Sequence, residues 1–184
     1  TGASGRYYVN IANDGRWSIR NGETVLAEGW SDQIKADKNR LAARCVGDQL
    51  TLLVNDVELG SARDGAFASG SLNFGYAADT SGAGTFDNIL VEDWGTGQAA
   101  VSQPEPEKGE ILYEENFDHP DQLSGWDAKL DEKSQANPQD GAYRLAGDSS
   151  MAAFIQREQT FSDAVIEVDV KILGPARVGV LCRN

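Results

Sequence analysis

The stretch from Arg40 to Leu59, RLAARCVGDQLTLLVNDVEL, decides the fold. Its apolar side chains alternate with polar or small ones on both sides of the turn sequence Gly47-Asp48. The alternating apolar positions are Leu41, Ala43, Cys45, Leu50, Leu52 and Val54. Because side chains of a strand point to opposite faces with period two, and Asn55-Asp56 tolerates left-handed backbone angles, the stretch predicts a three-stranded antiparallel meander. The apolar face of this meander requires a second sheet.

Alternation of the same kind recurs along the chain, and no stretch shows the helical period of about 3.6 residues. Turn sequences rich in Asn, Asp and Gly separate the alternating segments, as in Asn13-Asp14-Gly15 and Asn21-Gly22. The further segments expected as strands are 6–12, 16–20, 24–28, 70–78, 85–91, 111–117, 142–145, 152–156, 164–172 and 177–183. We therefore predict an all-β fold.

The composition disfavours some classes of partner. The chain has 184 residues, which suits one domain or two small ones. Its net charge of −13 repels phosphate backbones, so no nucleic-acid partner is expected. No stretch approaches the ~20 consecutive apolar residues of a membrane span, so membrane insertion is not expected. Two cysteines suit either one disulfide or two buried thiols.

Seven segments resemble parts of one family of β-sandwich. Those in the second part of the chain resemble the opening half of a laminin-G-like, concanavalin A-like jelly-roll module: ENFDHPDQLSGW, DGAYRL, TFSDAVIEVDV and GVLCR. Those in the first part resemble its closing half: YYVNIANDGRWSI, NRLAARCVGDQLTLLVNDVEL and TFDNILVEDW. The resemblance implies a two-sheet antiparallel β-sandwich. Such modules occur in bacterial extracellular proteins, often without assigned catalysis, which implies an extracellular or cell-surface location.

The two halves stand in swapped order. Residues 1–94 resemble the closing half and residues 110–184 the opening half, with the polar linker GTGQAAVSQPEPEKG at 95–109. Joined end to end, Asn184 and Thr1 would form an uninterrupted family segment. Three explanations are open: a circular permutant, one period of a tandem array, or a subunit completed by a neighbouring copy. Because the sequence lacks an initiator methionine at Thr1, we expect a processed product or an excerpt of a longer protein, which favours assembly.

Cys45 and Cys182 lie on the apolar sides of their segments, and the resemblance brings those segments close together. Oxidising extracellular conditions then favour a disulfide, provided that the two Cα atoms lie within about 7 Å. In a self-closed chain this bond is internal, and closing a loop of that length stabilises the fold by roughly 3–5 kcal/mol. In an array the same bond joins successive subunits, and this is the arrangement we expect.

Glu167 and Asp169 share one face of a predicted strand and resemble the start of the ExDxxE strand of laminarinase-type glycoside hydrolases. Retaining hydrolysis needs two suitably placed carboxyl groups, and the further Glu of that pattern is absent, since Lys171 and Ile172 follow. We therefore favour a solvated strand face with cross-strand ion pairs, and expect four arginines on the same side. These are Arg16, Arg20, Arg44 and Arg183. No enzyme is expected.

The same arginines, with Tyr8 and Asn10, are candidates for a sugar-binding platform, since aromatic rings stack on pyranose faces and Arg and Asn bind hydroxyl groups. The tryptophans expected near strand ends, Trp30, Trp94 and Trp126, could serve in the same way. Packing or interface roles for all of these residues are the favoured alternative.

A structural calcium ion is the one cofactor that the resemblance suggests. Asp87 and Asp118 are expected to approach each other in the folded module, where the resemblance implies such an ion, and oxygen ligands suit Ca²⁺. His119 is the only histidine, which excludes a multi-histidine metal site and argues against a Ser-His-Asp triad.

The function expected from these observations is structural. A non-catalytic extracellular module would assemble with neighbouring copies of itself into an array or filament by completing β-sandwiches. A carbohydrate-binding module that holds a polysaccharide is the alternative, and a degenerate glycoside hydrolase is the third hypothesis.

Limited proteolysis should cut the chain first between residues 98 and 108. This segment is polar and contains Pro104 and Pro106, so we expect it to lack regular structure and to bury little area. The masses of the first fragments identify the cleavage site. Resistance of this segment in assembled material would mean instead that it packs at an interface.

Overall fold

The computed structural model of the chain describes residues 6–78, 81–94, 109–119, 126–129, 134–147 and 153–183. These residues form fifteen strands and no helix. The strands are β1 (Tyr7–Ala12), β2 (Arg16–Asn21), β3 (Thr24–Trp30), β4 (Lys38–Val46), β5 (Gln49–Val54), β6 (Val57–Arg63), β7 (Gly70–Ala78), β8 (Gly82–Asp93), β9 (Ile111–Glu115), β10 (Trp126–Lys129), β11 (Ser134–Gln139), β12 (Ala142–Gly147), β13 (Ala153–Phe161), β14 (Ala164–Leu173) and β15 (Ala176–Cys182).

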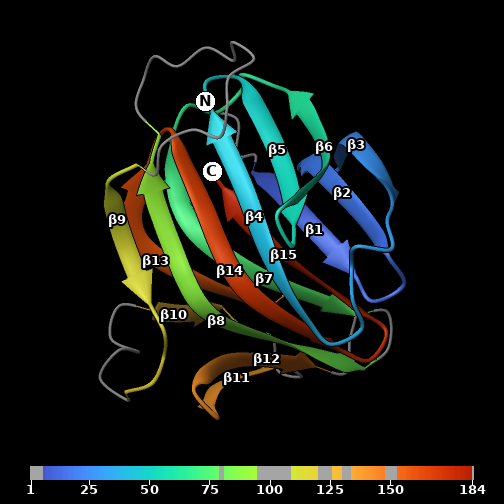
Figure 1. Cartoon of the computed structure of the whole chain (residues 1–184). Helices are drawn as coiled ribbons and strands as arrows, with labels where there is room; N and C mark the ends of the chain where they lie inside the picture. The colour runs from blue at the N-terminus through green and yellow to red at the C-terminus, as the bar shows by residue number, and fades with distance from the viewer. Residues whose placement is uncertain are drawn as a thin grey trace.

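The strands form two sheets that pack face to face (Figure 1). The seven-stranded sheet has the order β10-β13-β7-β15-β1-β2-β3. The eight-stranded sheet has the order β11-β12-β8-β14-β4-β5-β6, and β9 pairs with β8 beside this path. Neighbouring strands pair antiparallel, as in β14 with β4 and β15 with β1. The predicted all-β, two-sheet antiparallel β-sandwich is therefore confirmed.

The predicted meander is β4-β5-β6, at one end of the eight-stranded sheet. Leu41 faces Val54 across the first pair, and Val54 faces Val57 across the second. Asn55 and Asp56 adopt φ angles of 52° and 67°, which are the left-handed angles expected of the turn. The alternation of the sequence thus predicted both the strands and their connections.

The two parts of the chain on either side of the linker interleave. We call residues 1–94 the N-terminal half and residues 110–184 the C-terminal half. Strand β14 of the C-terminal half lies between β8 and β4, and β15 lies between β7 and β1 (Figure 1). Strand β9 of the C-terminal half also pairs with β8, with Glu115 opposite Ile89. A single chain therefore closes its own sandwich.

The core lies between the sheets and takes side chains from both halves. Its largest fully buried side chains include Tyr7, Phe74, Phe86, Leu41 and Leu145. Burying one such side chain contributes about 1.5–3 kcal/mol relative to leaving it in water. Each half separately would expose these faces, so the halves depend on each other for a core.

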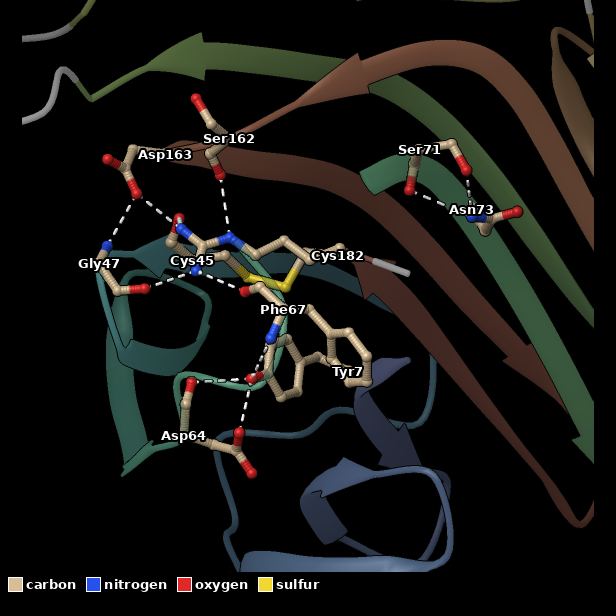
Figure 2. Close-up of a disulfide and its surroundings, with 11 residues drawn as sticks. Tyr7, Cys45, Gly47, Asp64, Phe67, Ser71, Asn73, Ser162, Asp163 and Cys182 are labelled. Carbon is tan, nitrogen blue, oxygen red and sulfur yellow. Dashed lines mark hydrogen bonds and ion pairs between the residues drawn. A yellow bond between two sulfur atoms is a disulfide. The ribbon is translucent and has the colours of Figure 1, made fainter. Parts of the chain in front are cut away.

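A disulfide joins the two sheets and the two halves (Figure 2). Cys45 lies on β4 of the eight-stranded sheet and Cys182 on β15 of the seven-stranded sheet, with their Cα atoms 6.6 Å apart. The predicted pairing of these cysteines is confirmed, but the bond lies within one chain and not, as expected, between successive subunits.

Two strands were missed by the sequence analysis, and both lie at sheet edges. Strand β10 is the first strand of the seven-stranded sheet and β11 the first of the eight-stranded sheet. Strand β11 contains Pro138, which edge strands tolerate because one side of an edge strand makes no ladder hydrogen bonds. The predicted linker at 95–109 lies outside the described residues except for Gly109.

At the other end of the sandwich, Trp17 of β2 fills the space between the two edge strands β3 and β6. Its ring lies where a Cβ atom would stand at Gly29 of β3 and at Gly60 of β6. Glycine at both positions therefore lets one indole pack against both sheets.

Replacing Gly60 by Ala should destabilise the fold by about 1–3 kcal/mol, because the added methyl group overlaps the Trp17 ring and overpacks this edge. Midpoints of guanidinium unfolding measure the change. Gly65→Ala is the matched control, since a Cβ there meets nothing closer than the Cβ of Asp48 at 3.8 Å. Equal midpoints for the two variants would contradict the packing role of Trp17.

Candidate functional site

The outer face of the seven-stranded sheet carries two adjoining hollows over β1, β2, β7 and β15. The inward side chains of these strands, such as Val9 and Val180, are buried in the core, so the alternate side chains point outward. The two hollows share Asn10, Arg20, Ala77 and Arg177. We call the combined hollow the sheet groove; its lining also includes Tyr8, Arg16 and Glu28.

Small residues form the floor of the sheet groove. Gly179 of β15 lies opposite Gly75 of β7 on one side and opposite Asn10 of β1 on the other. A Cβ at Gly179 would overlap the side-chain oxygen of Asn10, so glycine allows that amide to lie across the neighbouring strand. Ala77 lies opposite Arg177 in the next outward-facing row. At this level neither β7 nor β15 carries a side chain, and Gly75 itself lines the groove.

Polar and charged groups form the walls. Arg16 donates from Nε to Asp14 Oδ2 over 2.7 Å, and Arg20 donates from Nη2 to the Glu23 carbonyl over 2.8 Å. The guanidinium group of Arg16 holds the pKa of the Asp14 carboxyl below its usual value. The charged lining residues are Arg16, Arg20, Arg177, Asp14, Glu23 and Glu28. Cations and carboxylates thus occur in equal number, so the groove offers donors and acceptors without an excess of either charge.

Trp30 lies at the rim, at the end of β3, and 68% of it is exposed. Its indole Nε1 donates to the backbone carbonyl of Asp14 over 2.8 Å. Gly15, with a φ of 87°, leaves room for the indole, because a Cβ there would overlap Trp30. The aromatic ring is therefore fixed at the surface next to Asp14, a lining residue of the groove.

The structure brings together four of the six predicted ligand-binding residues. Tyr8, Asn10, Arg16 and Arg20 all line the sheet groove. Arg44 lies instead on β4 of the eight-stranded sheet, where its guanidinium carbon is 4.9 Å from the centroid of the Trp94 ring. Arg44 therefore contributes nothing to the groove.

The prediction that Arg183 lies on a solvated face is wrong. Arg183 follows the end of β15 with a φ of 61°, and only 2% of it is exposed. Its guanidinium group donates to the Cys45 carbonyl over 2.8 Å and to Asp163 Oδ1 over 2.6 Å. It also donates to the carbonyls of Ser162 and Gly47. Arg183 is therefore a buried structural residue beside the disulfide. Its left-handed backbone turns the side chain inward, whereas the alternation along β15 predicted that it would point toward solvent.

The three candidate tryptophans have different environments. Trp126 is buried in the core and donates from Nε1 to the Tyr113 hydroxyl over 3.3 Å. Trp94 lies beneath the guanidinium group of Arg44. Of the three, Trp30 is the one placed as an exposed platform.

Sequence reasoning missed Arg177, Glu28 and the glycine floor. Arg177 stands between buried Ala176 and Val178, so the alternation itself placed it outward. Nothing in the sequence indicated that Gly75 and Gly179 lie opposite each other, since that depends on the pairing of β7 with β15.

Glu167 and Asp169 lie on the outer face of the eight-stranded sheet and make the predicted cross-strand ion pairs. Arg40 Nη2 is 2.9 Å from Glu167 Oε2, and Lys38 Nζ is 2.7 Å from Asp169 Oδ2. The partners expected from the sequence were wrong, because Arg16 and Arg20 belong to the other sheet. On β4, Arg40 lies opposite Asp169 and Lys38 lies opposite Lys171. The pairs Arg40–Glu167 and Lys38–Asp169 are therefore diagonal across the ladder.

Asp87 and Asp118 are the two predicted calcium ligands. Burial raises the pKa of Asp87 above its usual value, and the charges of Asp169 and Asp118 raise it further. Within the described ranges, no group of three or more His, Cys, Asp or Glu side chains is arranged to hold a metal ion. Calcium binding by Asp87 and Asp118 stays a prediction.

No protein-family model and no curated protein sequence matches this chain. The β-sandwich is established by the structure, and the jelly-roll resemblance of its segments stays an expectation. The part of the chain that the structure describes contains no helix long and apolar enough to cross a membrane.

Replacing Asp169 by Asn should lower the free energy of unfolding near pH 7. Burial opposes ionisation of Asp169, but hydrogen bonds from Lys38 and Asn88 and the charge of Arg40 outweigh it, so its pKa lies below the usual 3.8. A carboxyl with a depressed pKa contributes stability above its unfolded pKa and loses it as pH falls through the folded pKa. We expect a loss of about 1–3 kcal/mol at neutral pH, measured by urea unfolding, and a smaller loss near pH 3.

Asp87→Asn is the matched control, because Asp87 lies opposite Asp169 on β8 but has a raised pKa. Its ionised form is disfavoured by folding, so its replacement should leave stability at neutral pH unchanged or higher. Equal losses in the two variants would contradict the opposite pKa shifts.

Proposed function

We propose that this chain is a non-catalytic extracellular module that binds a neutral polysaccharide in the sheet groove. The observation that carries the proposal is the exposed indole of Trp30, held by its hydrogen bond to Asp14 at the rim of a polar groove. Binding sites are typically concave, with a small number of placed polar groups that fix the orientation of the ligand.

The lining of the groove matches the chemistry of sugar hydroxyl groups. Arg20 and Asn10 donate hydrogen bonds, while Glu28 and the Asn10 carbonyl oxygen accept them. The aromatic faces of Trp30 and Tyr8 suit the apolar faces of pyranose rings. Because the charges of the lining balance, a neutral chain fits better than a uronate-rich or sulfated one.

The extracellular location is supported by the disulfide between Cys45 and Cys182. Disulfides persist in oxidising compartments and are rare in reducing ones. A binding role without hydrolysis is supported by the ion pairs of Glu167 and Asp169 with Arg40 and Lys38. These carboxylates are engaged by strand neighbours, whereas a catalytic pair must face the substrate.

A panel of soluble polysaccharides tests the proposal: β-glucan, xylan and mannan as neutral chains, and polygalacturonate as an acidic one. Binding is measured by retardation of the native protein in gels that contain each polymer. We expect a neutral polymer to retard the chain, and Arg20→Ala to weaken that binding about tenfold by removing a charged donor. Trp30→Ala should also weaken it and should abolish any change in tryptophan fluorescence.

Arg63→Ala is the matched control for Arg20→Ala. Arg63 is an exposed arginine on β6 that pairs with Asp48, away from the groove. Binding that is lost equally in both arginine variants, or that is strongest for polygalacturonate, would contradict a neutral-glycan site.

A further inference from the structure

The two halves of the sandwich complete each other at the centre of both sheets. In the eight-stranded sheet, Glu167 of β14 lies opposite Ala42 of β4 on one side and Leu90 of β8 on the other. In the seven-stranded sheet, Val180 of β15 lies between Val9 of β1 and Phe74 of β7. Removing the C-terminal half would thus leave β7 and β8 without any neighbour and expose one edge each of β1 and β4, together with the core side chains between the sheets. Such edges and apolar faces require a complement, from the same chain or from another copy.

The connection between the halves is much longer than self-closure requires. The backbone N–H of Asp93 donates to the carbonyl of Glu110 over 2.9 Å, so the strand ends on either side of the linker already touch. Antiparallel neighbours are commonly joined by about two to five residues. Here fifteen residues, 95–109, separate Trp94 from Glu110. A chain of that length spans up to ~50 Å when extended, which is enough to reach an adjacent molecule.

The contacts between the halves are the same whether the two halves belong to one chain or to two copies of the chain. If the C-terminal half of one copy occupied the sandwich of another, each strand pair and core contact between halves would be reproduced. Exchange of an identical element between protomers therefore loses few of these contacts. What distinguishes the closed chain is any bond that holds its own two halves together.

The disulfide is that bond. Cys45 belongs to the N-terminal half and Cys182 to the C-terminal half, separated by 137 positions in the sequence. Arg183, next to Cys182, adds hydrogen bonds to the carbonyls of Cys45, Gly47 and Phe67, all in the N-terminal half. The hydrogen bonds can be made again with another copy, but the covalent bond must first be broken.

We propose that a second copy of this chain is a binding partner, and that the redox state of Cys45 and Cys182 controls the exchange of halves between copies. A dithiol reductant transfers two electrons and two protons to the disulfide, which yields two thiols and the oxidised, cyclic reductant. The halves then exchange. A small-molecule disulfide such as oxidised glutathione takes the electrons back, and the new bond covalently fixes the arrangement present at that moment.

Exchange would make the sheet groove a shared site. Tyr8, Asn10 and Arg20 belong to the N-terminal half, whereas Arg177 belongs to the C-terminal half. In an exchanged assembly the partner copy supplies Arg177, so each groove remains complete. Two copies can close into a dimer, and successive exchange without closure gives a filament.

An isotope-mixing experiment tests the proposal. Unlabelled and ¹⁵N-labelled chains, both oxidised, are mixed at high concentration, treated with dithiothreitol and re-oxidised with oxidised glutathione. Non-reducing gels should show a species of twice the 19.8 kDa chain mass that collapses on reduction. Peptide mapping should find Cys45 of one isotope joined to Cys182 of the other. Without dithiothreitol, we expect bonds within one isotope.

The matched control is a rearranged chain in which residues 110–184 precede residues 1–94 and the linker is removed. Since Cys182 and Tyr7 are paired neighbours, this chain keeps both cysteines and all fifteen strands but joins the halves by a short hairpin. It should remain monomeric after the same treatment. Circular dichroism of both reduced chains verifies that the β-sheet content is kept.

Four outcomes would overturn the proposal. The first is the absence of mixed-isotope disulfides after reduction and re-oxidation. The second is their formation to the same extent in the rearranged chain, which would indicate random cross-linking. The third is exchange of the oxidised chain without reductant, and the fourth is loss of β-sheet structure on reduction. Polysaccharide binding by the oxidised monomer is measured separately, so failure of either proposal leaves the other intact.

Discussion

The insertion of β14 and β15 into the middle of the two sheets is the constraint on which the rest of the structure depends. Each of these strands has neighbours from the N-terminal half on both sides, so neither sheet is continuous without the C-terminal half. The core follows from this arrangement, because Val168 and Val180 occupy its centre between residues of the N-terminal half. The pairing of β14 and β15 with the N-terminal half joins segments far apart in the sequence, and long-range pairing of this kind is slow compared with local pairing.

The disulfide and Arg183 act on the same junction by different means. The covalent bond joins Cys45 to Cys182, and the guanidinium group satisfies carbonyl groups that a strand end would otherwise leave buried without partners. Arg183 is itself neutralised by Asp163, which also accepts a hydrogen bond from the Gly47 backbone. The end of the seven-stranded sheet is thus tied to a turn of the other sheet by one covalent bond and a compact polar network.

The central strands were predictable because apolar and polar side chains alternate along them. In β14, for example, apolar side chains point to the core at every second position. The edge strands β10 and β11 were not, since few neighbours constrain their composition. The same alternation placed Tyr8, Asn10, Arg16 and Arg20 outward correctly. It failed for Arg183, because a single left-handed residue after the last strand redirects the side chain. The depth of the sheet groove depends on glycines paired across strands, and pairing is a property of the fold that one sequence does not specify.

The pairing of Tyr7 with Cys182 also determines how the module responds to tension. Force that pulls Tyr7 away from Cys182 opens the β1–β15 ladder from its first pair, so its hydrogen bonds are loaded one after another rather than together. A ladder opened in this way offers little mechanical resistance. The disulfide changes the outcome, because Cys182 at the first rung is anchored to Cys45 on β4 in the opposite sheet. Load on the C-terminal end therefore passes across the core into the second sheet before β15 can peel away.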